Sequence, residues 1–193
     1  MKKETILTIV IALLVGLIGG YLVFSISGRG KAPTSPGGGI TPGAGSPVDY
    51  QQRIAEAEKL LAQDPKNLNA WVQLGNDYFD TGQAQQAVNA YGKALELDPK
   101  NPNILTDQGI MYKQLGWYDK ALANFEKAQQ IDPKHQQSLV NMGVVYAENL
   151  NQPEKARKTW ERAIEIDPSS SASQQLKLWL EQLKTSPQSF QKK

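Results

Sequence analysis

The sequence repeats with a period of about 34 residues over much of its length. Four prolines mark the period at spacings of 34, 34 and 35 residues: Pro65, Pro99, Pro133 and Pro168. In each interval a glycine recurs at the same place and a tyrosine follows three residues later, as Gly75 and Tyr78 do in the first. Such a period is typical of arrays of helix-turn-helix units. One pair of short helices buries too little apolar surface to offset the entropy of ordering it, so the units are expected to stack.

Hydrophobic spacing within the first unit predicts two helices. The first helix has residues at i, i+3, i+4 and i+7 on one face: Trp71, Leu74, Gly75 and Tyr78. Gly82 is then expected to end this helix. The inner face of a second helix is marked by Ala87, Tyr91 and Ala94, and Pro99 ends that helix. The unit is therefore expected to be a helical hairpin.

Together these positions resemble the tetratricopeptide repeat (TPR) pattern along its whole length. The second unit matches at Leu105, Gly109, Tyr112, Ala121, Phe125, Ala128 and Pro133, with Gln108 where an apolar residue is usual. The third unit matches at Leu139, Met142, Gly143, Tyr146, Ala156, Trp160, Ala163 and Pro168. The third unit has one extra residue, which we expect to widen the turn between its helices. In that turn an asparagine can take the left-handed conformation and Pro153 can begin the next helix. The resemblance covers residues 68–170 and implies an all-α TPR solenoid.

Three helix pairs with a covering helix at each end follow from this register. The N-terminal covering helix is expected within 49–67, the repeats over 68–101, 102–135 and 136–170, the C-terminal capping helix over 171–184 and a disordered tail over 185–193. Capping residues are expected at Asn67, Asn101, His135 and Ser170, because side chains such as Asn and Ser accept hydrogen bonds from the free amides of a first helical turn.

The N-terminal part of the chain predicts a single transmembrane helix. After a short tail over 1–4, residues 5–26 contain no charge. At 1.5 Å per residue they would form about 33 Å of helix, enough to cross a bilayer core of about 30 Å. A cleaved secretory signal is the alternative, although its apolar region normally has only about 7–15 residues. Residues 27–48 are rich in glycine and proline, which predicts a flexible linker.

Charges on both sides of this anchor nearly balance, so the positive-inside rule decides its orientation only weakly. A short lysine-bearing tail normally stays in the cytoplasm, which places the repeats outside the cytoplasmic membrane, most simply that of a bacterium. Within the span, small residues recur every four positions at Ala12, Gly16 and Gly20, which favours a homodimer through the membrane helix. The alternative is that glycine is simply common in membrane spans.

Composition argues against several functions. The chain has no cysteine, and from Asp49 onward it has 17 basic against 18 acidic residues, the totals of 21 and 19 less the four basic and one acidic residue before it. A nearly neutral domain has no basic stripe for nucleic acid. His135 is the only histidine, so neither a metal site nor a catalytic triad is expected. We predict no enzyme activity and no cofactor.

A second stripe on the first helix of each unit lies away from the packing stripe and is the candidate peptide groove. Its members are Asn69, Val72, Asn76, Phe79 and Asp80 in the first unit, Asn103, Thr106, Ile110, Lys113 and Gln114 in the second, and Gln137, Val140, Asn141, Val144, Ala147 and Glu148 in the third. In proteins that resemble this one, these helices line a concave groove that holds a peptide. The alternative is that the aliphatic members, Val72, Ile110, Val140 and Val144, pack against the neighbouring repeat.

The resemblance also bears on the ligand. Some TPR domains clamp a partner's C-terminal carboxylate with lysine, arginine and amide side chains. Only Asn76 matches that clamp here, while Val72, Asp107, Gln137 and Asn141 stand at its other positions. We therefore expect no such clamp. A partly apolar segment of another protein is the expected ligand.

We predict a membrane-anchored protein–protein interaction module or scaffold. Tethering near a partner raises its effective concentration, so a weak groove would suffice. Anchored TPR subunits of cytochrome c maturation systems share this order of anchor, spacer and repeats, so holding an apocytochrome for haem attachment is one alternative. A structural membrane protein that assembles by self-association is the other.

Overall fold

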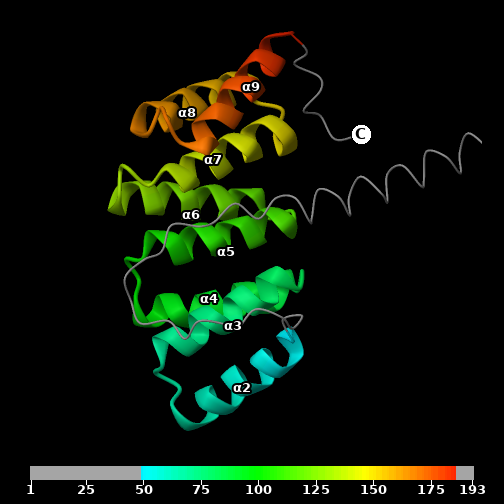
Figure 1. The fold of residues 1–193 in the computed structure, drawn as a ribbon, viewed down its shortest axis with the longest axis vertical. Helices are drawn as coiled ribbons and strands as arrows, with labels where there is room; N and C mark the ends of the chain where they lie inside the picture. Colours follow the sequence, from blue (N-terminus) through cyan, green and yellow to red (C-terminus); the bar gives the residue numbers. More distant parts are fainter. Residues whose placement is uncertain (1–48, 186–193) are drawn as a thin grey trace, which may run out of the picture. The chain divides into compact units, whose positions relative to one another are not determined.

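The computed structural model describes residues 49–185 and shows that this part of the chain is helical (Figure 1). Its elements are α2 (Tyr50–Gln63), α3 (Leu68–Asp80), α4 (Ala84–Leu97), α5 (Pro102–Gln114), α6 (Tyr118–Ile131), α7 (Gln136–Val144) with its π-helical continuation η1 (Val145–Asn149), α8 (Pro153–Ile166) and α9 (Ser171–Thr185). Within 49–185, no helix is long and apolar enough to cross a membrane. The predicted anchor over 5–26, with Ala12, Gly16 and Gly20, lies outside the described residues, as do the linker over 27–48 and residues 186–193 of the predicted tail.

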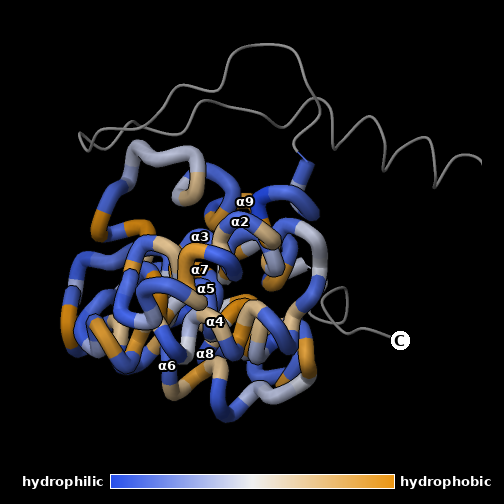
Figure 2. The backbone as a smooth tube through the Cα atoms, turned by 90° about the horizontal axis from the view of Figure 1, so that it is seen from below, coloured by the Kyte–Doolittle hydropathy of each residue, from blue (hydrophilic) through white to orange (hydrophobic). Residues whose placement is uncertain are grey.

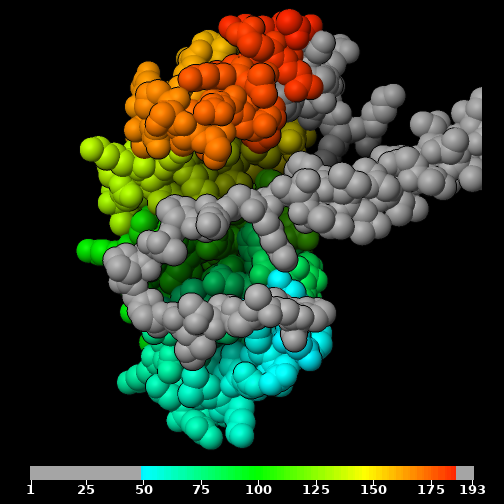
Figure 3. Space-filling view, viewed as in Figure 1, coloured from blue at the N-terminus to red at the C-terminus, as the bar shows by residue number. Residues whose placement is uncertain are grey.

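The helices stack in chain order as three antiparallel pairs. Helix α3 packs on α4, α5 on α6, and α7 with η1 on α8, and successive pairs meet where α4 contacts α5 and α6 contacts α7. Helix α2 covers one end of the stack and α9 the other, as the space-filling view shows (Figure 3). The predicted all-α solenoid of three helix pairs between two covering helices is therefore confirmed for the described part of the chain.

Each helix is amphipathic, and its apolar face is buried between its neighbours. Hydrophobic and hydrophilic segments alternate along the helical tube in Figure 2. The alanines of the repeat pattern, among them Ala94 and Ala128, are fully buried. Beside them, Tyr91, Phe125 and Trp160 from the second helices have at most 1% of their surface exposed. Each pair thus contributes one fully buried large ring to a core that otherwise consists of alanines and aliphatic side chains such as Leu105 and Leu139.

The recurring glycines make room for these rings. A Cβ atom on Gly75 would lie 2.6 Å from ring atoms of Tyr91. Gly109 stands in the same relation to Phe125, and Gly143 stands closest of all to Trp160. Real side chains do not approach so closely, so glycine is required where the first helix meets the ring of the second. This is the physical reason for the glycine at that point of each repeat.

Helix α2 is fastened to the stack by an ion pair as well as by apolar contacts. Ile54, Ala57 and Leu61 pack on α3. Arg53 Nη2 lies 2.6 Å from Oδ1 of Asp77, whose side chain is fully buried. Burial raises the pKa of Asp77, and the Arg53 guanidinium opposes that shift. The covering helix therefore supplies the cation for a carboxylate inside the first repeat.

Three of the four predicted helix caps are confirmed, and the fourth is wrong. Asn67 Oδ1 accepts a hydrogen bond from Ala70 N at 3.0 Å, and Asn101 and Ser170 accept equivalent bonds at the starts of α5 and α9. His135 holds the corresponding position before α7 but makes no side-chain cap bond. Its half-buried ring instead reaches back to α5, because polar partners are available there.

The extra residue of the third repeat lies in the helix rather than in the turn. Each of the three turns has one residue with positive φ, and these are Gly82, Gly116 and Asn151. Gln83 N donates to Tyr78 O, five residues back, whereas Gln152 N donates to Tyr146 O, six residues back. The π-helix η1 absorbs the insertion, so the expectation of a wider turn is wrong. The left-handed asparagine and the helix start at Pro153 are as expected.

Candidate functional site

The predicted groove residues divide by exposure into three groups. Six side chains are exposed: Asn69, Asn76, Asp80, Asn103, Gln114 and Gln137. Seven are partly buried: Val72, Phe79, Ile110, Lys113, Val140, Asn141 and Glu148. Three are buried: Thr106, Val144 and Ala147. The exposed group comes from α3, α5 and the start of α7, so these helices share one accessible face.

Several aliphatic members of the stripe belong to the core instead. Val72 and Ile110 pack, each partly buried, against the core of the first two repeats. Val140 packs against the core formed by α7, α8 and α9, and Val144 is part of that core. Thr106 is fully buried, and its Oγ1 donates to Pro102 O at 2.8 Å. The packing interpretation therefore holds in part for Val72, Ile110 and Val140 and fully for Val144. Thr106, which that interpretation did not include, is buried as well, so neither Val144 nor Thr106 can touch a ligand in this conformation.

The structure brings three of the predicted residues together in one pocket. Asn76, Phe79 and Asp80 of α3 line a cavity of about 290 Å³ with Tyr91 of α4 and Asp107 of α5. The Tyr91 hydroxyl donates to Asn76 Oδ1 at 2.8 Å and so fixes the amide at the pocket wall. We call this cavity the α3–α5 pocket. It combines aromatic, amide and carboxylate groups from two adjacent repeats.

Asp107 is the residue that the sequence-based site list missed. It lies four residues after Asn103 and three before Ile110, which places it on the groove stripe. Its counterpart in the third repeat, Asn141, was on the list, so the repeat register alone could have identified it. Burial raises the pKa of Asp107 to about 6. Of the described residues, none donates a hydrogen bond to this carboxylate or pairs with it.

Negative charge gathers around Tyr91. The pKa of its hydroxyl is raised first by burial and then by the charges of Asp107, Asp80 and Asp77. Asp77 is paired with Arg53 and does not line the pocket. Asp80 and Asp107 do line it, so the α3–α5 pocket has a negative potential. In the described part of the chain, no group of three or more histidine, cysteine or acidic residues could hold a metal ion.

His135 joins the second and third repeats at the edge of the groove face. Its Nε2 lies 2.9 Å from Asn103 Oδ1, and its Nδ1 lies 3.5 Å from Thr106 Oγ1. Burial lowers the pKa of the imidazole, and the charge of Asp132 opposes this. Two of the predicted groove residues are therefore held in place by the histidine.

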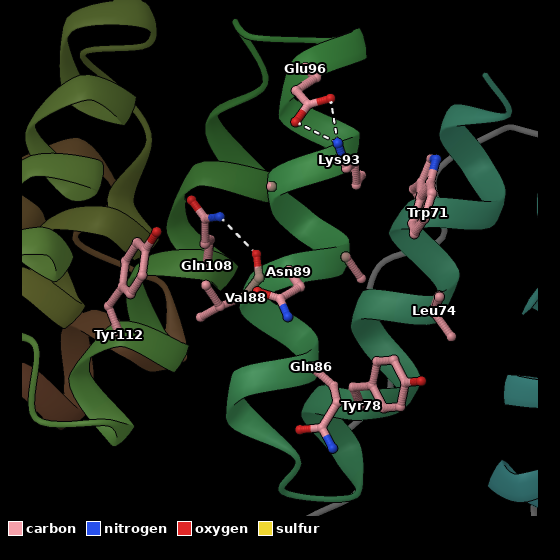
Figure 4. A pocket seen from close by; sticks show the side chains of 12 residues that line it. Trp71, Leu74, Tyr78, Gln86, Val88, Asn89, Lys93, Glu96, Gln108 and Tyr112 are labelled. Carbon is pink, nitrogen blue, oxygen red and sulfur yellow. Dashed lines mark hydrogen bonds and ion pairs between the residues drawn. The ribbon is translucent and has the colours of Figure 1, made fainter. Parts of the chain in front are cut away.

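A larger cavity of about 670 Å³ is lined by residues of α3, α4 and α5 around α4, and we call it the outer cavity (Figure 4). Its walls include Trp71 and Tyr78 of α3 and Tyr112 of α5, and Lys93 and Glu96 of α4 form an ion pair at its margin. Sequence reasoning treated Trp71 and Tyr78 as packing residues, and both are partly buried. Some walls of this cavity are therefore side chains that also pack against the hydrophobic core.

Gln108, which replaces the usual apolar residue, is buried and fully engaged. Its Nε2 donates to Val88 O at 3.0 Å, and its Oε1 accepts from Asn124 Nδ2 at 2.8 Å. Asn124 also donates to Leu105 O. The substitution is tolerated because both ends of the amide find partners in α4 and α6.

Two family models match the chain. One, described as a TPR repeat, matches residues 75–116, and the other, described as a tetratricopeptide repeat, matches residues 112–180. The chain therefore carries tetratricopeptide repeats. No curated protein matches it.

Solved structures share the fold. A crystal structure of MamA is similar with a TM-score of 0.61 and 20% identity, over 74% of this chain and 84% of that one. A tetratricopeptide repeat protein from Parabacteroides merdae is similar with a TM-score of 0.62 and 24% identity, over 71% of this chain and 54% of that one. The first TPR of Spaghetti, bound to an HSP90 peptide, is similar with a TM-score of 0.52 and 24% identity, over 72% and 98%. The repeats and the fold indicate a protein–protein interaction module, a class that is typically not enzymatic.

Proposed function

We propose that this protein binds a partly apolar peptide segment of another protein across the face formed by α3, α5 and the start of α7. The observation that carries the proposal is the α3–α5 pocket, because it opens where the sequence predicts the groove and is lined by residues of two repeats. Its floor offers the Phe79 ring for an apolar side chain and the Asn76 amide for a backbone group. Amides suit peptides because each carries both donors and an acceptor.

The similarity to solved structures supports this mode of binding. One neighbour was solved with a bound HSP90 peptide, of sequence SRMEEVD. That peptide is acidic, whereas the pocket of this chain contains Asp80 and Asp107. We therefore propose the same kind of ligand, an extended segment, but not the same charge. This agrees with the expectation that the carboxylate clamp is missing.

We further propose that residues 5–26 hold the module in a membrane, with the repeats outside the cytoplasm. The support is the uncharged apolar stretch and the glycine- and proline-rich spacer that follows it. Self-association through Ala12, Gly16 and Gly20, and the holding of an apocytochrome, stay predictions. Carbonate extraction of membranes and protease treatment of intact spheroplasts test the proposal. Release by carbonate, or protection from the protease, would contradict it.

The absence of cysteine allows a direct test of the binding face. Single cysteines would be placed in the full-length protein at exposed groove positions, Asn69→Cys and Gln114→Cys, and labelled with an environment-sensitive fluorophore. Matched labels at Asn89→Cys on α4 and Lys127→Cys on α6 report on the second helices of the first two pairs, where both residues are exposed. The ligands are nine-residue peptides selected from a displayed random library on the full-length protein in detergent micelles.

Binding in the groove shifts the emission of the labels at 69 and 114 and leaves those at 89 and 127 unchanged. A response confined to 89 would place the ligand in the outer cavity around α4 and overturn the groove proposal. Failure to select any peptide would also overturn it. A double substitution, Val72→Glu with Ile110→Glu, would be a weaker test of the groove because both side chains pack against the core.

A further inference from the structure

The α3–α5 pocket contains one carboxylate whose charge is not compensated within the described residues. Asp107 is largely buried, has no hydrogen-bond donor and has no ion-pair partner there. A desolvated carboxylate without a partner is costly, and a cation in contact with it removes that cost. The pocket is therefore incomplete electrostatically unless a positive group enters it.

The second carboxylate lies at the same pocket. Asp80 follows Phe79 on α3, is exposed and lines the cavity together with Asp107 of α5. A group in the pocket would lie between the acid of α3 and the acid of α5. No lysine or arginine is among the residues that line the cavity, and Arg53 pairs with Asp77 instead.

The remaining walls suit a long side chain rather than a bare ion. The ring of Phe79, which is only partly buried, is an apolar surface against which an alkyl stem can pack while its charged end stays hydrated. A guanidinium can also stack on an aromatic ring. The volume of about 290 Å³ accommodates one such side chain. For a bare metal ion the pocket offers only two carboxylates, and the described residues contain no group of three or more metal-ligating side chains.

We propose that the α3–α5 pocket receives a lysine or arginine side chain of the bound segment, with Asp80 and Asp107 as its ion-pair partners and Phe79 against its stem. This inference rests on the proposed function and names the chemistry of the partner: a segment with a basic residue beside apolar ones. An acidic segment is repelled by the same two carboxylates.

The test uses the peptides selected on the full-length protein and measures affinity by fluorescence anisotropy. Each basic residue of a selected peptide is replaced by glutamine and by glutamate. At one position, glutamine is expected to weaken binding to the wild type about tenfold or more, as for the loss of a charge-assisted hydrogen bond. The same exchange should change affinity less than about twofold on the double variant Asp80→Asn with Asp107→Asn. Binding of the basic peptide should also weaken with added salt.

Glu165→Gln is the matched control, because it removes one exposed carboxylate from α8, away from the pocket. It should leave the arginine-to-glutamine difference unchanged. If peptides shift the groove labels but glutamine or glutamate binds as well as arginine, this inference is wrong and the proposed function stands. If no peptide binds, both fall together. If the preference for arginine persists in the double variant, the basic residue is recognised elsewhere and the inference is overturned.

Discussion

The substitution Asp107→Asn is expected to stabilise the protein at neutral pH and to lose that effect in acid. The folded protein buries this carboxylate without a partner among the described residues, and burial raises its pKa to about 6. The unfolded chain hydrates it and restores an ordinary pKa near 3.8. Folding therefore takes up a proton between these values, and the free energy of unfolding falls as pH rises through that window. Below about pH 4 the penalty is absent, and above about pH 6 it is complete.

The pKa shift of Asp107 gives the size of the expected stability difference. About two pKa units correspond to about 3 kcal/mol, since one unit is about 1.4 kcal/mol. The pocket is open to water, which lowers the effective penalty, so we expect about 1 to 2 kcal/mol. In a domain of this size that raises the melting temperature of Asp107→Asn by roughly 3 to 6 °C at pH 7.5.

Urea unfolding of the full-length wild type and Asp107→Asn, followed by tryptophan fluorescence at pH 4, 5, 6 and 7.5, measures the difference. Comparing the two proteins at each pH cancels the titration of His135, whose lowered pKa acts in the opposite direction and destabilises the fold as pH falls. Glu165→Gln serves as the control and should show no pH-dependent difference. A variant that is less stable at pH 7.5, or a difference that is the same at all four values, would refute the reasoning.

Two further predictions concern the packing of the stack. Gly143→Ala should lower the free energy of unfolding by about 3 kcal/mol, because a Cβ there collides with the rigid, fully buried Trp160 ring. Gly92→Ala, where the new Cβ would lie 3.5 Å from Gln108 Nε2, should instead raise the free energy of unfolding by up to about 1 kcal/mol through better helix propensity. Equal effects of the two substitutions in thermal melts would contradict the ring argument. Arg53→Met should cost about 2 kcal/mol and speed amide hydrogen exchange in α2, since Asp77 stays buried without its cation. Unchanged exchange in α2 would show that this ion pair does not hold the covering helix.

The sequence predicted those parts of the fold that local chemistry decides. Asn67 and Asn101 cap helices because their short side chains reach the free amides of the next turn. Asn151 takes the left-handed conformation that glycine takes in the other turns. Each of these outcomes depends on a few neighbouring residues, which is why a repeat register was enough to find them.

The groove was harder to predict because its stripe borders the packing stripe of the same helix. Whether Val144 faces a ligand or a neighbouring helix depends on how α9 covers the third pair, and no local pattern reports that. His135 was predicted to be a helix cap by analogy with the other units, but its ring lies beside Asn103 of α5, 32 residues earlier in the chain. Asp107 holds the register position of Asn141, so the repeat pattern could have placed it in the groove, but the predicted stripe of the second unit did not include it.

The π-helix η1 at the end of α7 affects which helices can pair while the repeats fold. Look-alike hairpins can exchange partners while a repeat protein folds, since one first helix resembles another. The third hairpin differs in two ways: η1 shifts the start of α8 by one residue, and Trp160 is larger than the rings in the other two. Helix α8 is therefore expected to fit α7 better than α3 or α5, which would disfavour exchange of helices between the third hairpin and the other two.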